Sequence, residues 1–394
     1  MEKETVYAYG EDLIYLTACA LHGKSPDVQK VKEMNLSEIA RFSKWHSMQV
    51  ITYFSLSSLG EAAEKISPDA VASLKRWYAM ELRKLVLFDI ERERLSDFLT
   101  QQGIWFTVLK GAVLQYCYPR LGMRQMCDND ILVDESGAAA IRAYMEKNGY
   151  TVNGFGKGCH DGYTKDVLNF EIHRRLVSGM KENAVYADYF DKTYDRSRPS
   201  DTAERHLSCE DFYIYYIYHA YKHFSHGGTG IRTLMDIYVY RAKKGDVLDR
   251  AYIDRELSSI GLSEFEHRAA ELADKLFSER CIHPRENAEL DESDRAELLY
   301  YMKSGSFGTV VNLIGNSLER IAAGGAVDGK TKRRYLIARI FPPAELYAES
   351  YPRAGRHKVL IPFLWVHRIF RGIFSGGKTA TELRELKKAK KNNK

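Results

Sequence analysis

The hexapeptide Ile-Trp-Phe-Thr-Val-Leu at residues 104–109 marks a change in the pattern of the chain. It is a short apolar run rich in residues that favour β-structure, whereas residues 9–102 carry apolar side chains at helical spacing. The run therefore predicts a buried strand. Lys110-Gly111-Ala112 follows as a turn, and residues 112–118 are predicted to form a short helix that Pro119 ends.

A second strand is predicted at residues 128–133, Asp-Asn-Asp-Ile-Leu-Val, which begins with two acidic residues. A helix from Ser136 to Asn148 follows, and three further short strands are expected at 150–152, 163–167 and 169–174. Short connections between these elements indicate a small mixed sheet with two helices. With helical patterns on both sides of it, the chain is expected to have an α+β fold.

The pattern divides the chain into five parts. We expect a helical N-terminal region (1–102), the α/β core (103–205), a helical domain lining a cleft (206–339), an irregular and helical C-terminal segment (340–377) and a basic disordered tail (378–394).

Composition excludes several classes of protein. The 394 residues are 45% hydrophobic and 28% charged, as in an ordinary globular protein, so disorder is excluded for most of the chain. The net charge of +5 resides in residues 378–394, with seven basic and two acidic residues, so nucleic-acid binding is not indicated apart from this tail.

The protein is expected to be cytoplasmic. No apolar run approaches the roughly 18–20 residues of a membrane span. The acidic start, Met-Glu-Lys-Glu, argues against a secretory signal, and six scattered cysteines are expected to be free thiols. Oligomeric state is left open.

Three carboxylates carry the expected chemistry. Asp128 and Asp130 are two apart on a predicted strand, so their side chains share one face, and Glu171 lies on a later strand between apolar residues. If the two strands are neighbours, the three converge. Such a cluster can hold two Mg²⁺ ions roughly 3.5–4 Å apart for in-line attack on a phosphate. The alternative is a solvated strand end.

These motifs together resemble the bacterial nucleotidyltransferases of the DNA polymerase beta-like superfamily. The resemblance is carried by 109–111 (Leu-Lys-Gly), Arg124, 128–133, Gly149-Tyr150 and 171–176 (Glu-Ile-His-Arg-Arg-Leu), and by a second motif at 219–223 (His-Ala-Tyr-Lys-His) with 231–237.

The resemblance implies transfer of a nucleoside monophosphate from an NTP, expected to be ATP, to an acceptor hydroxyl with release of pyrophosphate. It makes Asp128 and Asp130 the metal-binding pair and Glu171 the third carboxylate, which helps to activate the acceptor. Gly111 would let the triphosphate approach the backbone. Ala112 stands where the superfamily usually has Ser or Gly, so backbone N–H groups, Lys110 and Arg124 would neutralise the triphosphate.

Other readings stay open. His219 and His223, four apart on one helix face, are predicted either to contact nucleotide or acceptor, to pack, or to bind zinc with His160 or His173. Arg232 and Asp236 are expected to form a helix-surface ion pair.

Two alternatives concern the chain as a whole. Ala112 and the long stretch 112–127 would suit a catalytically silent nucleotide sensor or helical interaction protein. The aromatic and basic segment 353–371 is expected to pack on the N-terminal helices, with a membrane surface as the alternative.

Overall fold

The computed structural model describes residues 3–178, 183–283, 290–322, 325–342, 357–374 and 377–388. The N-terminal part is helical, and its longest element is the 34-residue α6. Pro68 occupies the first turn of α6, where its missing N–H is tolerated. The helices of this part are α1 (Lys3–Leu21), α2 (Val28–Glu33), α3 (Leu36–Trp45), α4 (Gln49–Ser57), α5 (Glu61–Ile66) and α6 (Pro68–Gln101).

The sheet is small and mixed, and its order is β1-β2-β5-β4-β3. Strands β2 and β5 pair in parallel, and the other neighbours are antiparallel. The elements of this part are β1 (Phe106–Val108), α7 (Gly111–Leu114), β2 (Asn129–Val133), α8 (Ala138–Lys147), β3 (Thr151–Asn153), β4 (His160–Lys165) and β5 (Leu168–His173). The strands expected from sequence are thus confirmed, with bounds shifted by a few residues.

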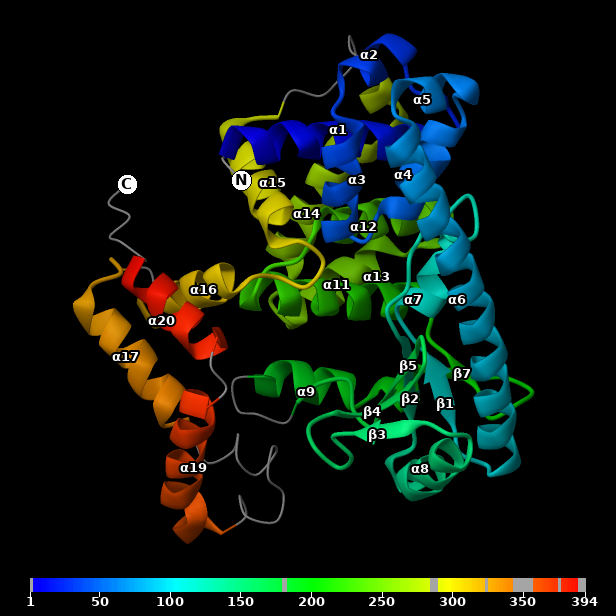
Figure 1. The fold of residues 1–394 in the computed structure, drawn as a ribbon. Helices are drawn as coiled ribbons and strands as arrows, with labels where there is room; N and C mark the ends of the chain where they lie inside the picture. The colour runs from blue at the N-terminus through cyan, green and yellow to red at the C-terminus, as the bar shows by residue number, and fades with distance from the viewer. Residues whose placement is uncertain are drawn as a thin grey trace.

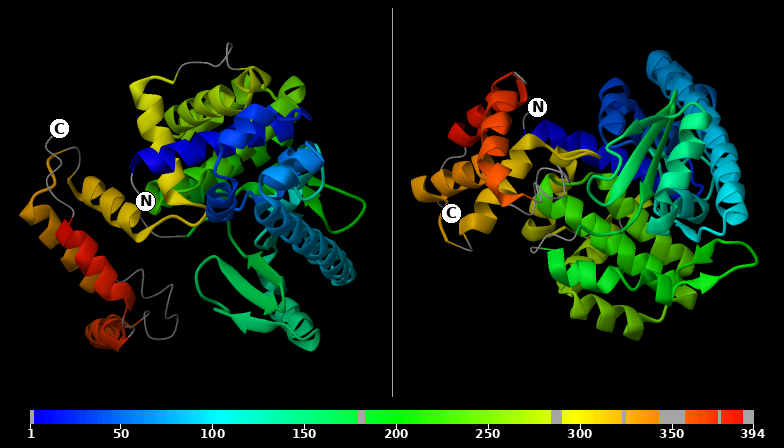
Figure 2. Two further views of the ribbon diagram at one scale, coloured as in Figure 1. Left: turned by 45° about the horizontal axis from the view of Figure 1, so that its top comes forward. Right: turned by 90° about the horizontal axis from the view of Figure 1, so that it is seen from below.

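The two faces of the sheet have different partners (Figures 1 and 2). One face packs on α6 and α8 through a core that includes Phe88, Ile131 and Phe170. The other face lies toward α11 (Cys209–His226), whose buried residues share a second core with Leu132. The sheet is therefore a middle layer between helices.

The remaining elements are mostly helical. They are α9 (Ala184–Phe190), α10 (Thr193–Arg196), β6 (Arg198–Pro199), β7 (Arg205–His206), α12 (Ile231–Lys244), α13 (Arg250–Ser259), α14 (Ser263–Phe277), α15 (Glu292–Ser304), α16 (Val310–Ala322), α17 (Gly329–Ile340), α19 (Ile361–Phe374) and α20 (Gly377–Lys388). Within the described ranges, helices predominate around a five-stranded mixed sheet and a two-stranded one, so the predicted α+β fold is confirmed.

The C-terminal part differs from expectation. Most of α20 falls in the stretch predicted as a disordered tail, and its Leu386 is buried in a cluster with Ile314, Leu318 and Tyr335. Helix α19 packs on α17, not on the N-terminal helices as predicted (Figure 1). Residues 343–356 and 375–376 of the predicted C-terminal segment, and residues 389–394 of the predicted tail, lie outside the described residues.

Candidate active site

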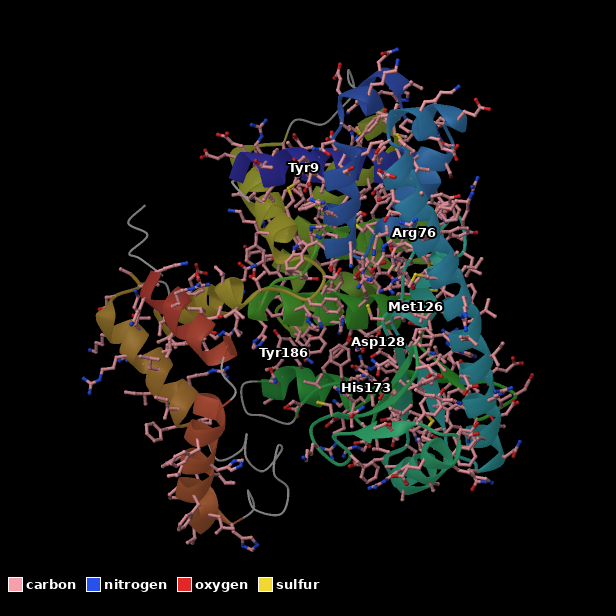
Figure 3. The ribbon with its side chains drawn as sticks, in the orientation of Figure 1. Tyr9, Arg76, Met126, Asp128, His173 and Tyr186 are labelled. Carbon is pink, nitrogen blue, oxygen red and sulfur yellow. The ribbon has the colours of Figure 1, made fainter. Side chains whose placement is uncertain are left out.

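Strand register brings two of the predicted carboxylates together. In the parallel pair of β2 and β5, Asp130 stands directly beside Glu171, so both side chains lie on one face of the sheet. Asp128 lies just ahead of β2, two residues before Asp130. Figure 3 labels Asp128 and His173, the residue that ends β5, both below α11. Strand register therefore brings Asp130 and Glu171 together on one sheet face, and the convergence of all three carboxylates on one ion stays a prediction.

Asp130 is the centre of this group. Its Oδ1 accepts hydrogen bonds from Lys110 Nζ at 2.5 Å and from His173 Nε2 at 2.8 Å. Its Oδ2 is buried, and none of the described residues forms a hydrogen bond with it. Lys110 has a φ of +45°, a strained value for a residue with a side chain. Such strain persists where the surrounding structure imposes it, as here at the turn between β1 and α7.

The titration of the three acids reflects their crowding. Burial and the neighbouring Asp130 raise the pKa of Asp128, and the same two causes raise the pKa of Glu171 to about 7. Burial opposes the ionisation of Asp130, but Lys110 and His173 hold its pKa well below the usual range. One ammonium group thus does not neutralise three carboxylates, and an additional cation would relieve the repulsion.

Two histidines adjoin Glu171. In the antiparallel pair of β4 and β5, His160 stands opposite His173, so both imidazoles share the face of Glu171. His173 Nε2 lies 3.7 Å from one oxygen of Glu171 and His160 Nε2 lies 3.9 Å from the other. Ligand atoms of the three residues lie within 4.8 Å of one another, close enough to share a metal ion. From the sequence, His160 and His173 were considered only as further zinc ligands beside His219 and His223. The spacing of Glu171 and His173, two apart on a predicted strand, could have indicated that these two side chains share a face.

Arg124 is placed differently from the prediction that it faces a triphosphate. Its guanidinium is buried, and its Nε and Nη2 donate to the two oxygens of Asp236 at 3.1 and 3.2 Å. The hydroxyls of Tyr118 and Tyr216 donate to the same carboxylate at 2.5 and 2.9 Å. All of these groups come from α11, α12 and the loop before β2, so the network fixes that loop to the helices.

The expected surface pair of Arg232 and Asp236 is wrong. Asp236 is buried and binds Arg124, while Arg232 Nη1 donates to the backbone carbonyl of Gln125 at 3.0 Å. Both side chains therefore hold the loop that leads to Asp128. A helical Asp between Met235 and Ile237 was the sequence signal for burial.

The glycine and alanine of the turn serve the packing of this loop. A Cβ on Gly111 would lie 2.6 Å from Nη1 of Arg124 and 3.2 Å from Met126. Ala112 is buried in the core between the sheet and α6. Gly111 is thus required for the close approach of the Arg124 side chain.

Helix α11 brings the predicted histidine pair toward the carboxylates. The rings of His219 and His223 are 4.5 Å apart, and His219 is half-buried. Burial, followed by the positive charge of Lys110, lowers the pKa of His219 well below its usual value. Tyr215, one turn earlier, is buried and also near Lys110, which opposes the rise that burial causes in its pKa.

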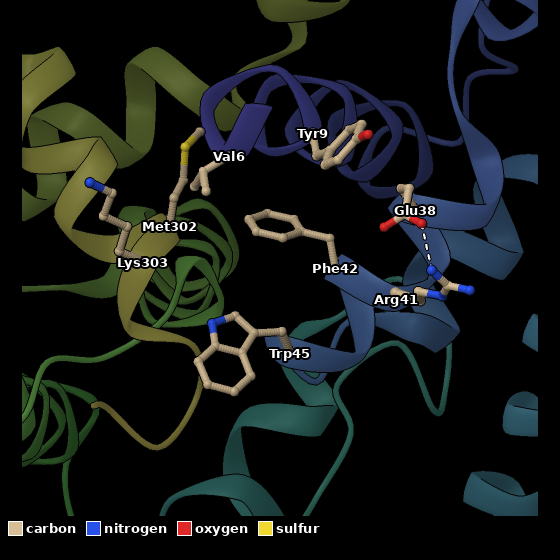
Figure 4. A pocket seen from close by; sticks show the side chains of 8 residues that line it. All are labelled: Val6, Tyr9, Glu38, Arg41, Phe42, Trp45, Met302 and Lys303. Carbon is tan, nitrogen blue, oxygen red and sulfur yellow. Dashed lines mark hydrogen bonds and ion pairs between the residues drawn. The ribbon is translucent and has the colours of Figure 1, made fainter. Parts of the chain in front are cut away.

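A cavity of about 380 Å³ lies apart from these residues. It is formed by α1, α3 and α15, and Figure 4 shows its lining of Val6, Tyr9, Glu38, Arg41, Phe42, Trp45, Met302 and Lys303. None of the predicted site residues lines it. The candidate active site is therefore identified by the side chains gathered around Asp130 and by the strand register that brings them together, not by this cavity.

Comparison with known proteins gives one family. A family model described as "Uncharacterised nucleotidyltransferase" matches residues 32–278, which include the sheet, the carboxylates and helices α11 and α12. No curated protein matches the chain, and no solved structure does.

Proposed function

Because the chain belongs to the family of uncharacterised nucleotidyltransferases, we propose that it transfers a nucleoside monophosphate from an NTP to an acceptor hydroxyl. ATP is the proposed donor, and the fold is proposed to be that of the DNA polymerase beta-like superfamily. The oxygen of the acceptor attacks the α-phosphorus, and the bond to the bridging oxygen breaks to release pyrophosphate.

The pairing of Asp130 with Glu171, with Asp128 beside them, carries the proposal. These three residues would hold Mg²⁺, and the donor set fits, since oxygen ligands suit this ion. Asp130 Oδ2 is buried and accepts no hydrogen bond from the part of the chain that the structure describes. Asp128 takes part in none of the hydrogen bonds or ion pairs found within the described ranges. Mg²⁺ bound there would neutralise phosphate charge and lower the pKa of the acceptor hydroxyl.

The protein's own groups supply positioning and charge. Lys110 holds Asp130 in the free protein and would carry positive charge beside the departing pyrophosphate. Glu171 would accept the proton of the acceptor hydroxyl. His219 and His223 on α11 would border the nucleotide or acceptor.

Replacement of Asp128 tests the proposal with the least disturbance of the fold, since this side chain is only half-buried. Titration calorimetry with Mg-ATP should show binding to the wild type and at least a roughly hundredfold loss in Asp128→Asn. Asp246→Asn, an exposed acid in the turn after α12, is the matched control. Equal Mg-ATP affinity in Asp128→Asn and the wild type would refute the proposed metal site.

Pyrophosphate release over a panel of hydroxyl acceptors then separates the transferase from a nucleotide sensor. Release that depends on Asp128 supports transfer.

A further inference from the structure

Helix α19 and the turn before it carry an uncovered apolar stripe. Val359, Phe363, Val366 and Phe370 follow one another at intervals of four, three and four residues, which places them on one helix face. Their exposed fractions are 81, 70, 51 and 55%, so no described part of the chain covers this face. Four large apolar side chains in one stripe are more than scattered surface residues.

The opposite side of α19 already has a partner. Ile361 is buried, and the ring of Trp365 packs edge-on against Phe341, 5.1 Å between centroids. Helix α17 adds the exposed Ile337 and Ile340 beside this contact. Helix α19 is therefore apolar on both sides, and a helix of that kind is normally covered on both.

Positive charge accompanies the apolar surface. Residues 325–394 contain 17 Lys and Arg against five Asp and Glu, although the whole chain is only +5. On α17, Arg333 and Arg334 are exposed four and three residues before Ile337, on the same helix face. Two of the five acids form ion pairs within the same segment: Glu382 pairs with Arg339, and Glu385 pairs with Arg384 and Lys388.

Figures 1 and 2 place this surface at one side of the molecule. Helices α17, α19 and α20 lie together beyond α16, on the far side of α11 from the long helix α6. Helix α16 links them to the rest, through contacts with α11. A flat partner could thus reach this group of helices without meeting the sheet.

We propose that the exposed faces of α17 and α19 bind the surface of an anionic lipid bilayer. Apolar side chains would enter the boundary between headgroups and acyl chains, and the flanking basic residues would face anionic headgroups. This binding is interfacial: within the described ranges, no helix has the length and apolar character needed to cross a membrane.

The observations favour lipid over two other partners. RNA would satisfy the charge, but the aliphatic members of the stripe, Val359 and Val366, offer no ring for a base to stack on. A second copy of the chain would bring the same positive charge against the same face, which opposes self-association.

Vesicle sedimentation with the full chain tests the inference without nucleotide, so its outcome is separate from that of the proposed activity. The chain should bind vesicles of phosphatidylcholine with roughly one third phosphatidylglycerol at least about tenfold more tightly than pure phosphatidylcholine. Phe363→Glu with Phe370→Glu should lower binding to the anionic vesicles by about tenfold or more. Met80→Glu with Val86→Glu, two exposed apolar positions on α6, is the matched control and should bind as the wild type.

Three results would overturn the inference. One is absence of binding to the anionic vesicles. Another is equal binding by the Phe363 and Phe370 double variant with unchanged circular dichroism, since charge would then act without the apolar stripe. The third is a wild-type chain that forms a dimer or binds RNA, together with a double variant that has lost this interaction but still binds the vesicles.

Discussion

Asp236→Asn should unfold the chain far more readily than a typical substitution, because it removes a charge from a buried pair. Four hydrogen bonds from Arg124, Tyr118 and Tyr216 end on the two oxygens of Asp236. An amide keeps one acceptor oxygen and turns an NH₂ group toward two of these donors. The guanidinium of Arg124 would remain buried without a counter-charge.

Breaking a buried pair in this way costs about 3–5 kcal/mol, a large share of the roughly 5–15 kcal/mol that stabilises a typical protein. Urea unfolding followed by circular dichroism measures the loss. The matched control is Glu146→Gln, which breaks the exposed pair with Arg142 at 3.0 Å and should cost less than about 0.5 kcal/mol.

The double variant Arg124→Met with Asp236→Leu sharpens the test. Apolar replacement of both partners should recover part of the loss, because no charge is left buried. A loss below about 1 kcal/mol in Asp236→Asn, or no recovery in the double variant, would refute the anchoring role. A double variant that folds and binds Mg-ATP as the wild type would also show that Arg124 does not bind the triphosphate.

Three other predictions follow from single contacts. His46 is buried and neutral, since Nδ1 accepts a backbone N–H, Nε2–H donates to a backbone carbonyl, and burial lowers its pKa to about 3. Below a pH of about 6.5 the imidazole of His46 binds a proton in the unfolded state but not in the folded state, so the free energy of unfolding should fall by up to about 1.4 kcal/mol per pH unit as the pH is lowered. Unfolding measured as a function of pH should show a shallower fall for His46→Gln. For His160→Ala, titration calorimetry should show Zn²⁺ binding weakened by about tenfold or more, with Mg²⁺ affinity little changed, because imidazole suits Zn²⁺ whereas Mg²⁺ prefers oxygen ligands; unchanged Zn²⁺ affinity would contradict a metal-binding role for the histidine. Gly111→Ala should cost about 1–3 kcal/mol in urea unfolding, since its Cβ would meet a guanidinium nitrogen at 2.6 Å, whereas Gly315→Ala, with open space in α16, should be neutral or stabilising.

The strands of the sheet were predictable because the apolar or alternating pattern of each one is visible in its own residues. The run at 104–109 and the alternation at 128–133 need no distant partner to be recognised, and both are strands in the structure. Alternation also placed Asp130 on the same face as Asp128. What alternation could not give is strand order: β5 lies between β2 and β4, and that order brings Glu171 beside Asp130.

The partner of Arg124 could not be read from spacing. Asp236 is 112 residues away in sequence, and a nearer partner, Arg232, sits four residues from it on the same helix. Helical spacing fits a pair of Arg232 with Asp236 equally well. The choice is made by burial, because a carboxylate packed among apolar residues requires several donors. Only the folded chain brings Tyr118 and Tyr216 to supply them.

The loop before β2 is held by residues outside the predicted core 103–205, so that core alone does not account for the geometry of the site. Glu81 of α6 accepts the N–H of Met126, Arg232 of α12 donates to the carbonyl of Gln125, and Asp236 holds Arg124. Three consecutive residues are thus fixed from helices on both sides of the sheet. Asp128 follows two residues later, so its position depends on helices that carry no part of the proposed chemistry. A change in α12 that loosens this loop should therefore weaken metal binding at Asp128 without touching a ligand.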